Sequence, residues 1–344
     1  LKGGPSLKKP SSCPARPSRE AMAAAPESTN GKVNEEELLE NVPSTKAYKN
    51  PEFLTSPGSR HIRIMCELQE PMKRLSDAGI DNYIQVIGSH LLMHPEARAA
   101  QLAAINQKIK QGGPREEMEA LNAKLRFDTS LQAMDKYYVV SMEIGEKISR
   151  WSQERKAQGL PTYHISTGGG PGAMEAANRG AQTSGAMTLG MGSTRPEWGG
   201  LNKYVSAEGA FQFHYFFMRK FWSAYKCMGL VALPGGLGTL DEIFEFLNLI
   251  ASRKITHRLP IILVGRDYWK KAINFEYLVE CAMISRQHAD LMVMVDTADE
   301  AFTYIVDQLQ RAEDSTESLT VENAKRRRLG KHPSDASAKG KTES

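Results

Sequence analysis

The chain has 344 residues, a formal net charge of +4 and 41% hydrophobic residues, which is typical of a globular domain with a sizeable core. No run of about 18 apolar residues occurs, so the sequence predicts no membrane span. The four cysteines (Cys13, Cys66, Cys227 and Cys281) lack the spacing of metal ligands. We therefore expect a reducing compartment, no metal site and no disulfide framework.

Both ends of the chain are rich in Pro, Ser, Gly and basic residues and too poor in apolar residues to form a core. Residues 1–42 are predicted to be a disordered extension; a cleaved leader or transit peptide and a native start at Met22 are open alternatives. Residues 314–344 are predicted to be a disordered basic tail, in which Lys325–Arg328 is either solvated or a nuclear or phosphate-binding signal. We expect a cytoplasmic location, with plastid or nuclear targeting as alternatives. The tails carry the positive excess, so nucleic-acid binding is not expected.

The apolar content and periodicity of residues 43–313 predict a single domain. Helical periodicity over 62–75 is followed by a buried strand within "NYIQVIGS" (82–89). A helical insert at about 95–127 is broken into two helices by Gly112-Gly113-Pro114, and a further helix is expected within 135–155.

Short apolar runs then alternate with helical patterns. The expected strands are "YHIST" (163–167), "AMTLGMG" (186–192), "GLVALPGG" (229–236), "LPIILVG" (259–265) and "LMVMVD" (291–296). Between the second and third lies "FQFHYFFMRKFWSAYKCM" (211–228), which is predicted to be one strongly aromatic helix. This alternation predicts an α/β fold with a doubly wound parallel sheet and helices on both faces.

Three of the expected strands end in glycine turns, namely "VIGS" (86–89), "STGGGPG" (166–172) and "LPGGLGT" (233–239). Ligands of such sheets bind at the carboxyl ends of the strands, where helix N-termini favour phosphate. A dinucleotide site is not supported, because no acid follows "GGGPGA" at the required distance, and there is no P-loop. The turns predict a nucleoside monophosphate or another small phosphorylated ligand, with a merely tight strand–helix turn as the alternative.

Charged residues lie beside these turns. Thr239 and Glu242 have the spacing of a capping box, which would explain Glu242 without catalysis. Glu245 is expected at the pocket edge or with its stem packed against a neighbour. Arg219 lies within the aromatic helix, where a buried cation needs a carboxylate or a substrate phosphate. We therefore expect a functional Arg219. Three histidines near these segments are second-rank candidates, because a lone histidine beside a strand is more often structural than catalytic: His90, His164 and His214.

The segments "GGGPGAMEAANRGA" (168–181), "FFMRK" (216–220) and "PGGLGTLDE" (234–242) together resemble the LONELY GUY family, whose members have often been labelled lysine decarboxylases. The last segment matches that family's hallmark PGGxGTxxE. The resemblance extends from about Tyr48 to Gln310 and is to the longer members of the family.

The resemblance implies a Rossmann-like phosphoribohydrolase, with residues 43–313 as its single nucleotide-binding catalytic domain. It would hydrolyse the N-glycosidic bond of a nucleoside 5′-monophosphate, with cytokinin riboside monophosphates as one alternative, to the free base and ribose 5-phosphate. It implies no cofactor, and a homodimer or higher homo-oligomer with the site near the interface. Arg219 and Glu242 would be catalytic. The implied phosphate- and ribose-binding residues are Ser89, Gly169, Gly170, Gly172, Met174, Glu175, Lys220, Pro234, Gly235, Gly236, Gly238 and Thr239.

Two departures from the family pattern concern the nucleotide. His90 stands where members usually have Arg, and "GSTRPEWGGLNKYV" (192–205) replaces a Leu-Pro-x-Glu-like stretch. The preferred base is therefore left open. A decarboxylase is not favoured, because nothing resembles a pyridoxal phosphate lysine site. A non-catalytic nucleotide sensor or carrier on the same scaffold is the alternative.

Overall fold

The computed structural model describes residues 45–193 and 199–328, with side chains as far as Asp314. The chain divides into two units, Leu1–Thr55 and Ser56–Ser344. The described part of the first unit forms η3 (Ala47–Lys49) and α1 (Pro51–Thr55). The predicted extension over 1–42, with its alternative start at Met22, and the tail beyond 328 lie outside the described residues.

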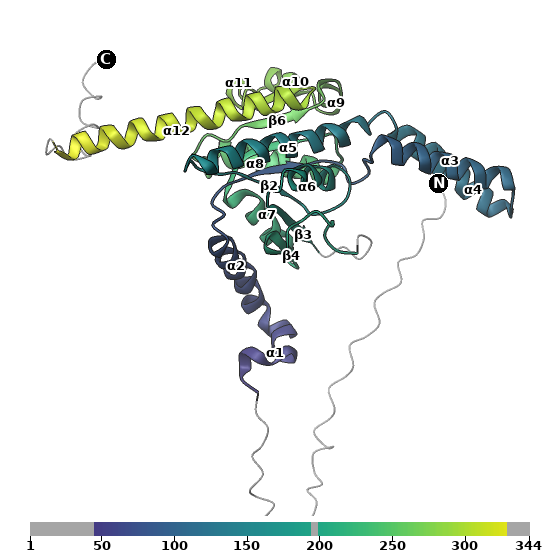
Figure 1. Ribbon diagram of the computed structural model, residues 1–344, viewed down its shortest axis with the longest axis horizontal. Coiled ribbons are helices and arrows are strands. Elements are labelled where there is room, and N and C mark those ends of the chain that lie inside the picture. The colour runs from purple at the N-terminus through teal and green to yellow at the C-terminus, as the bar shows by residue number, and fades with distance from the viewer. Residues whose placement is uncertain (1–44, 194–198, 329–344) are drawn as a thin grey trace, which may run out of the picture. The chain divides into compact units, whose positions relative to one another are not determined.

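The second unit is built on a seven-stranded sheet in which every pairing is parallel (Figure 1). The strand order is β4-β3-β2-β1-β5-β6-β7. Strands β2 to β4 are therefore added in sequence on one side of β1, and strands β5 to β7 on its other side. The predicted α/β doubly wound sheet is confirmed. The strands are β1 (Tyr83–Ile87), β2 (His164–Thr167), β3 (Thr188–Ser193), β4 (Ala210–Phe213), β5 (Cys227–Ala232), β6 (Ile261–Val264) and β7 (Met292–Val295).

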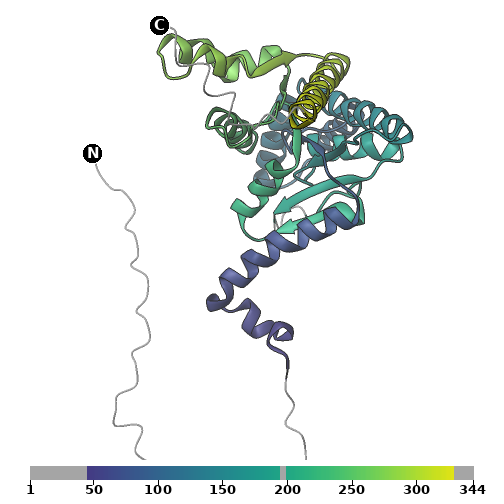
Figure 2. The ribbon, with the colours of Figure 1, turned by 90° about the vertical axis from the view of Figure 1, so that its left-hand side faces the viewer.

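Helices cover both faces of this sheet, because alternate strand residues feed two apolar clusters. Ile84 and Val86 join the cluster under α5 (Lys136–Ala157), α6 (Ala173–Thr183) and α12 (Ala298–Arg328). Tyr83 and Ile87 join the opposite cluster under α2 (Arg60–Asp77), α7 (Phe216–Tyr225), α8 (Leu237–Ala251) and α9 (Arg266–Ala272). Figure 2 shows α2 beside the β4 edge, where Arg74 Nη1 donates to the Ala210 carbonyl at 2.7 Å. Short helices complete the described part of the unit. The 3-10 helix η4 (Pro57–Ser59) precedes α2, and η6 (Ala207–Gly209) precedes β4. Helices α10 (Phe275–Glu280) and α11 (Arg286–Ala289) lie between α9 and β7.

The predicted insert forms a helical hairpin of α3 (Pro95–Gln111) and α4 (Arg115–Leu131), which lie side by side in Figure 1. Gly112, with φ of 73°, ends α3, and Pro114 precedes the first residue of α4. The break predicted from Gly112-Gly113-Pro114 is thus confirmed.

The aromatic segment differs from the prediction. Residues 211–213 belong to strand β4, and the helix begins only at Phe216. Phe211 and Phe213 are buried while Gln212 is exposed, which is the period of a strand and not of a helix. The abundance of aromatic residues masked this two-residue alternation.

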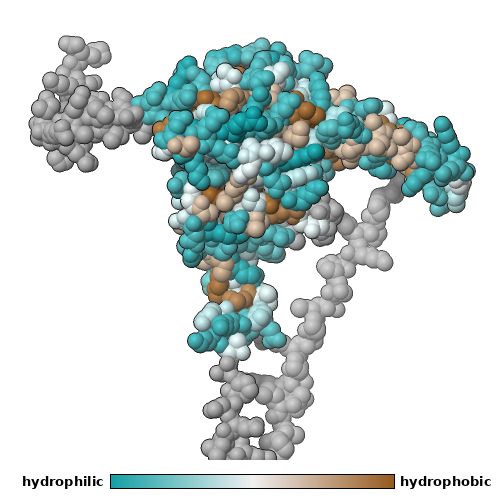
Figure 3. Space-filling model, in the orientation of Figure 1, coloured by the Kyte–Doolittle hydropathy of each residue, from teal (hydrophilic) through white to brown (hydrophobic). Residues whose placement is uncertain are grey.

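The last helix also extends past the predicted domain boundary at 313, since α12 continues to Arg328. Among the described residues, no helix is both long and apolar enough to cross a membrane. Figure 3 shows mainly hydrophilic residues on the face viewed there, with hydrophobic residues in small groups between them.

Candidate active site

The site lies where the direction of strand order reverses. β1 pairs with β2 on one side and with β5 on the other, so the connections after β1 and β5 leave toward opposite faces and open a crevice between them. Two backbone hydrogen bonds join these connections: Ser89 N donates to Pro234 O at 3.0 Å, and Leu233 N donates to Ile87 O at 2.9 Å. Two of the predicted glycine turns are therefore neighbours in space.

The remaining glycine turn, 166–172, packs against the turn that follows β1. Gly172 has φ of 74°, and a Cβ there would overlap the backbone of Ser89 and His90. Ala173 N donates to Ser89 O at 3.0 Å. Only glycine allows this approach, which places the start of α6 against the end of β1.

A buried ion pair forms the floor of the crevice. Arg219 Nη1, from α7, donates to Glu242 Oε1, from α8, at 2.7 Å. The two residues are only 9% and 6% exposed. Arg219 also stacks on the Phe216 ring, 4.7 Å from its centroid. The anion expected for a buried Arg219 is thus a carboxylate.

The Glu242 carboxyl has a raised pKa. Burial is the main cause, since it disfavours the charged form; the charge and hydrogen bond of Arg219 oppose the rise, and the nearby Glu245 and Asp241 add to it. The Nε of Arg219 is buried and has no hydrogen-bond partner in the described part of the chain. The pair therefore combines a buried N–H donor without a partner and a carboxyl group whose charged form is disfavoured by burial.

A pocket of about 380 Å³ opens above this pair. It brings together seven of the residues predicted for the site: Ser89, Met174, Arg219, Gly236, Gly238, Thr239 and Glu242. Gly236, Gly238 and Thr239 belong to the N-terminus of α8, where backbone N–H groups and the helix dipole favour an anion.

The other predicted residues lie outside this pocket. The carbonyls of Gly169 and Gly170 accept hydrogen bonds from Asn202, at 2.7 and 3.1 Å. Gly172 and Glu175 line a neighbouring cavity. The remaining three hold the turn or the helices together: Pro234 accepts from Ser89, Gly235 accepts from Tyr268, and Lys220 pairs with Asp241 and Glu245.

The capping-box interpretation is wrong. The N-cap of α8 is Gly236, so Thr239 is already inside the helix, and no side chain caps it. The carboxylate of Glu242 is bonded to Arg219 instead of a backbone N–H. Asp241 and Glu245 both pair with Lys220, at 2.9 and 3.2 Å.

Sequence reasoning missed several wall residues of this pocket. Leu237 is 86% exposed within the glycine turn, and Phe216 covers Arg219. An apolar residue inside "PGGLGT" is a signal that could have indicated a ligand contact. Of the three histidines, only His90 lines the pocket; His164 is half-buried beside the Met187 carbonyl, and His214 is exposed. Among the described residues, no cluster of three or more His, Cys, Asp or Glu side chains is placed to hold a metal ion.

Residues 174–305 match the sequence model of a protein family described as "Possible lysine decarboxylase". This segment runs from α6 to α12 and includes both Arg219 and Glu242. No curated protein matches the chain.

Several solved structures are similar, among them these two. The X-ray structure of TM1055, a structural genomics target, has 16% identity and a TM-score of 0.39, covering 66% of this chain and 99% of that chain. The molybdenum cofactor binding protein from the phototrophic bacterium Rippkaea orientalis has 15% identity and a TM-score of 0.33, covering 50% of this chain and 86% of that chain. These similarities are too low to bear on function.

Proposed function

We propose that the chain hydrolyses the N-glycosidic bond of nucleoside 5′-monophosphates, releasing the free base and ribose 5-phosphate. The observation that carries this proposal is the buried Arg219–Glu242 pair at the floor of a pocket whose rim is the glycine-rich N-terminus of α8. The rim suits the 5′-phosphate, and the floor suits a centre where positive charge develops.

In the proposed reaction, water attacks C1′ of the ribose while the bond to the base nitrogen breaks, through an oxocarbenium-like state. The ionised Glu242 would stabilise that charge or take a proton from the water. Arg219 would orient the Glu242 carboxylate and stabilise the departing base or the phosphate. Glu242 and the glycine-rich N-terminus of α8 would thus act on different parts of one substrate.

The decarboxylase description suits this pocket less well. Schiff-base chemistry with pyridoxal phosphate requires a lysine in the pocket, and no lysine is among the described residues that line it. Lys220 is next to Arg219 in the chain, but its ammonium group pairs with Asp241 and Glu245.

The direct test is to incubate the purified full chain with AMP, GMP, CMP, UMP and N6-isopentenyl-AMP and to measure free base and ribose 5-phosphate by chromatography. Release of base from at least one of them is expected, and the panel also identifies the preferred base. Binding of nucleotides without release of any base would instead favour the sensor or carrier alternative.

The pH dependence should reflect Glu242. Since Glu242 acts as an anion and burial raises its pKa, kcat/KM should rise with pH through a midpoint above the usual glutamate value of about 4.3. Glu245→Gln removes a charge that raises this pKa, so the midpoint should move to lower pH. A pH–rate profile of both proteins checks this, and a midpoint that stays fixed or moves upward would contradict the assignment.

We also propose that the chain assembles as a homodimer through α7. Phe217, Phe221 and Tyr225 recur every four residues and are 52%, 39% and 48% exposed, so they form one apolar stripe beside the pocket. The double substitution Phe217→Glu and Phe221→Glu should turn a dimer into a monomer in multi-angle light scattering. A wild-type chain that is monomeric at micromolar concentration would refute this proposal.

A further inference from the structure

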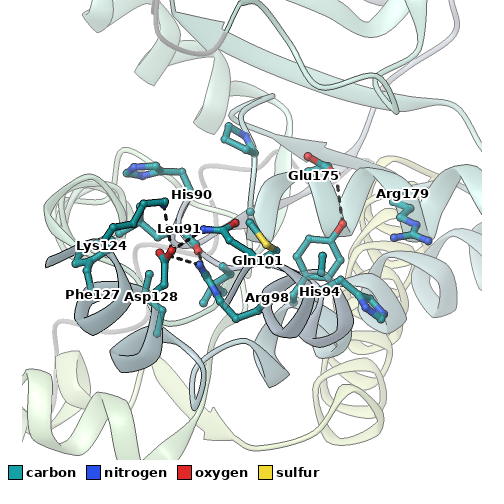
Figure 4. Close-up of a pocket in the computed structure, with 17 residues that line it drawn as sticks. His90, Leu91, His94, Arg98, Gln101, Lys124, Phe127, Asp128, Glu175 and Arg179 are labelled. Carbon is teal, nitrogen blue, oxygen red and sulfur yellow. Dashed lines mark hydrogen bonds and ion pairs between the residues drawn. The ribbon is translucent and has the colours of Figure 1, made fainter. Parts of the chain in front are cut away.

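A second cavity, of about 500 Å³, lies between the α3–α4 hairpin and the start of α6 (Figure 4). We call it the hairpin pocket. His90 and Leu91 line both this cavity and the pocket above Arg219 and Glu242. The glycine turn before α6 also divides the two cavities, since Gly172 faces the hairpin pocket and Gly168 the other.

The wall of the hairpin pocket is held by one buried arginine. Arg98, 2% exposed, donates from Nε to Asp135 Oδ2 at 2.7 Å, from Nη1 to Asp128 Oδ1 at 3.2 Å, and from Nη2 to the Leu91 carbonyl at 2.7 Å. These bonds tie α3 to α4, to the start of α5 and to the loop after β1. The cavity is therefore preformed, as ligand sites usually are.

Three cationic side chains (Arg98, Lys124 and Arg179) and two carboxylates (Asp128 and Glu175) line this cavity. The carboxylate of Asp128 already accepts from Arg98, from Gln101 at 2.6 Å and from Lys124 at 3.1 Å. Burial alone would raise the pKa of Asp128, but these donors outweigh it and hold the pKa below its usual range. Glu175 accepts from the Tyr138 hydroxyl at 3.3 Å.

The donors keep capacity beyond these contacts. An ammonium has three N–H groups and a guanidinium has five, so Lys124, which pairs with Asp128, and Arg179, which bonds Tyr138 at the opposite end of the cavity in Figure 4, can each donate further. A ligand that satisfies them must bring acceptor oxygens, and a phosphate does so with charge-assisted bonds.

The same cavity offers an aromatic surface. Phe127, on α4 one turn after Lys124, is 52% exposed although it is a large apolar side chain. Figure 4 shows Lys124 and Phe127 at the same end of the cavity. Nucleotide bases stack favourably on exposed aromatic rings of this kind.

We propose that the hairpin pocket binds a second nucleoside monophosphate, with Lys124 on its phosphate and Phe127 against its base. The choice of a nucleotide over other organic phosphates rests on the proposed function, because a nucleotide hydrolase meets such molecules as substrates. The bound nucleotide contacts His90 and Leu91 from the side opposite the substrate.

The test is calorimetric titration of the full-length Glu242→Gln protein, in which turnover is expected to be strongly slowed, with AMP, GMP, CMP and UMP. At least one nucleotide should bind at two sites per chain. Adding Lys124→Met or Phe127→Ser should weaken one of these sites about tenfold or more and leave the other unchanged. Lys110→Met, on the exposed side of the same hairpin, is the matched control and should leave both sites intact.

One site per chain for all four nucleotides would overturn the proposal, as would a second site that neither Lys124→Met nor Phe127→Ser weakens. Base release by the wild-type protein is a separate measurement. If base is released but one nucleotide binds, only this proposal fails. If two bind but no base is released, only the proposed hydrolysis fails.

Discussion

Replacing Glu242 with Gln is expected to lower kcat/KM for nucleoside monophosphates by about 10²–10⁴-fold, the usual contribution of a positioned acid or base. The amide oxygen can still accept the 2.7 Å hydrogen bond from Arg219, so the local packing should persist. In the proposed reaction, what is lost is the negative charge near the ribose and the ability to take a proton from water. Steady-state kinetics, with circular dichroism to confirm the fold, measure the effect.

The matched control is Glu245→Gln. It makes the same chemical change one helical turn further along α8, at a side chain that pairs with Lys220 and does not line the pocket. The kcat/KM of Glu245→Gln at neutral pH should be within a few-fold of the wild-type value. Only the midpoint of its pH–rate profile should shift, as predicted above. If Glu242→Gln and Glu245→Gln had equal effects, or if Glu242→Gln kept wild-type activity, Glu242 would not be catalytic.

The fold could be predicted because its signals are local. Short runs rich in Val, Ile and Leu, each ending in glycine, mark buried parallel strands such as β1 and β5. The break at Gly112 and Pro114 likewise acts through backbone geometry alone. The edge strand β4 was not predicted, because its two-residue alternation rests on Phe211 and Phe213 alone. The aromatic helix that follows has similar residues, so the two patterns could not be separated in the sequence.

The site was predicted less completely, since its geometry depends on long-range contacts. Burial and aromatic neighbours predicted that Arg219 needs an anion, but only the packing of α7 on α8 selects Glu242 over Asp241. Motif spacing also could not separate glycines that line the pocket from those, such as Gly169, whose carbonyls hold a neighbouring loop. The hairpin pocket was not foreseen, because its walls come from four separate segments.

The largest expected effect on stability comes from Arg98→Met. Asp128 and Asp135 are 2% and 0% exposed, and removing their shared cation leaves two buried carboxylates with only partial compensation. Breaking a buried ion pair in this way costs about 3–5 kcal/mol. Urea denaturation should show that loss in the free energy of unfolding. Arg115→Met on the same hairpin, which breaks the exposed pair with Glu119, should cost only about 0–1 kcal/mol.

A second substitution and a change of pH separate charge from packing in this effect. If the loss is electrostatic, Asp135→Asn in the Arg98→Met background should restore part of the stability by removing one unpaired charge. The Asp128 pKa is lowered in the folded protein, so the stability that depends on its ionisation is present above the unfolded pKa of about 3.9 and is lost as the pH falls below it. The difference between wild type and Arg98→Met should therefore narrow toward acid pH. A difference that stays constant with pH would mean that Arg98 stabilises the hairpin by filling space.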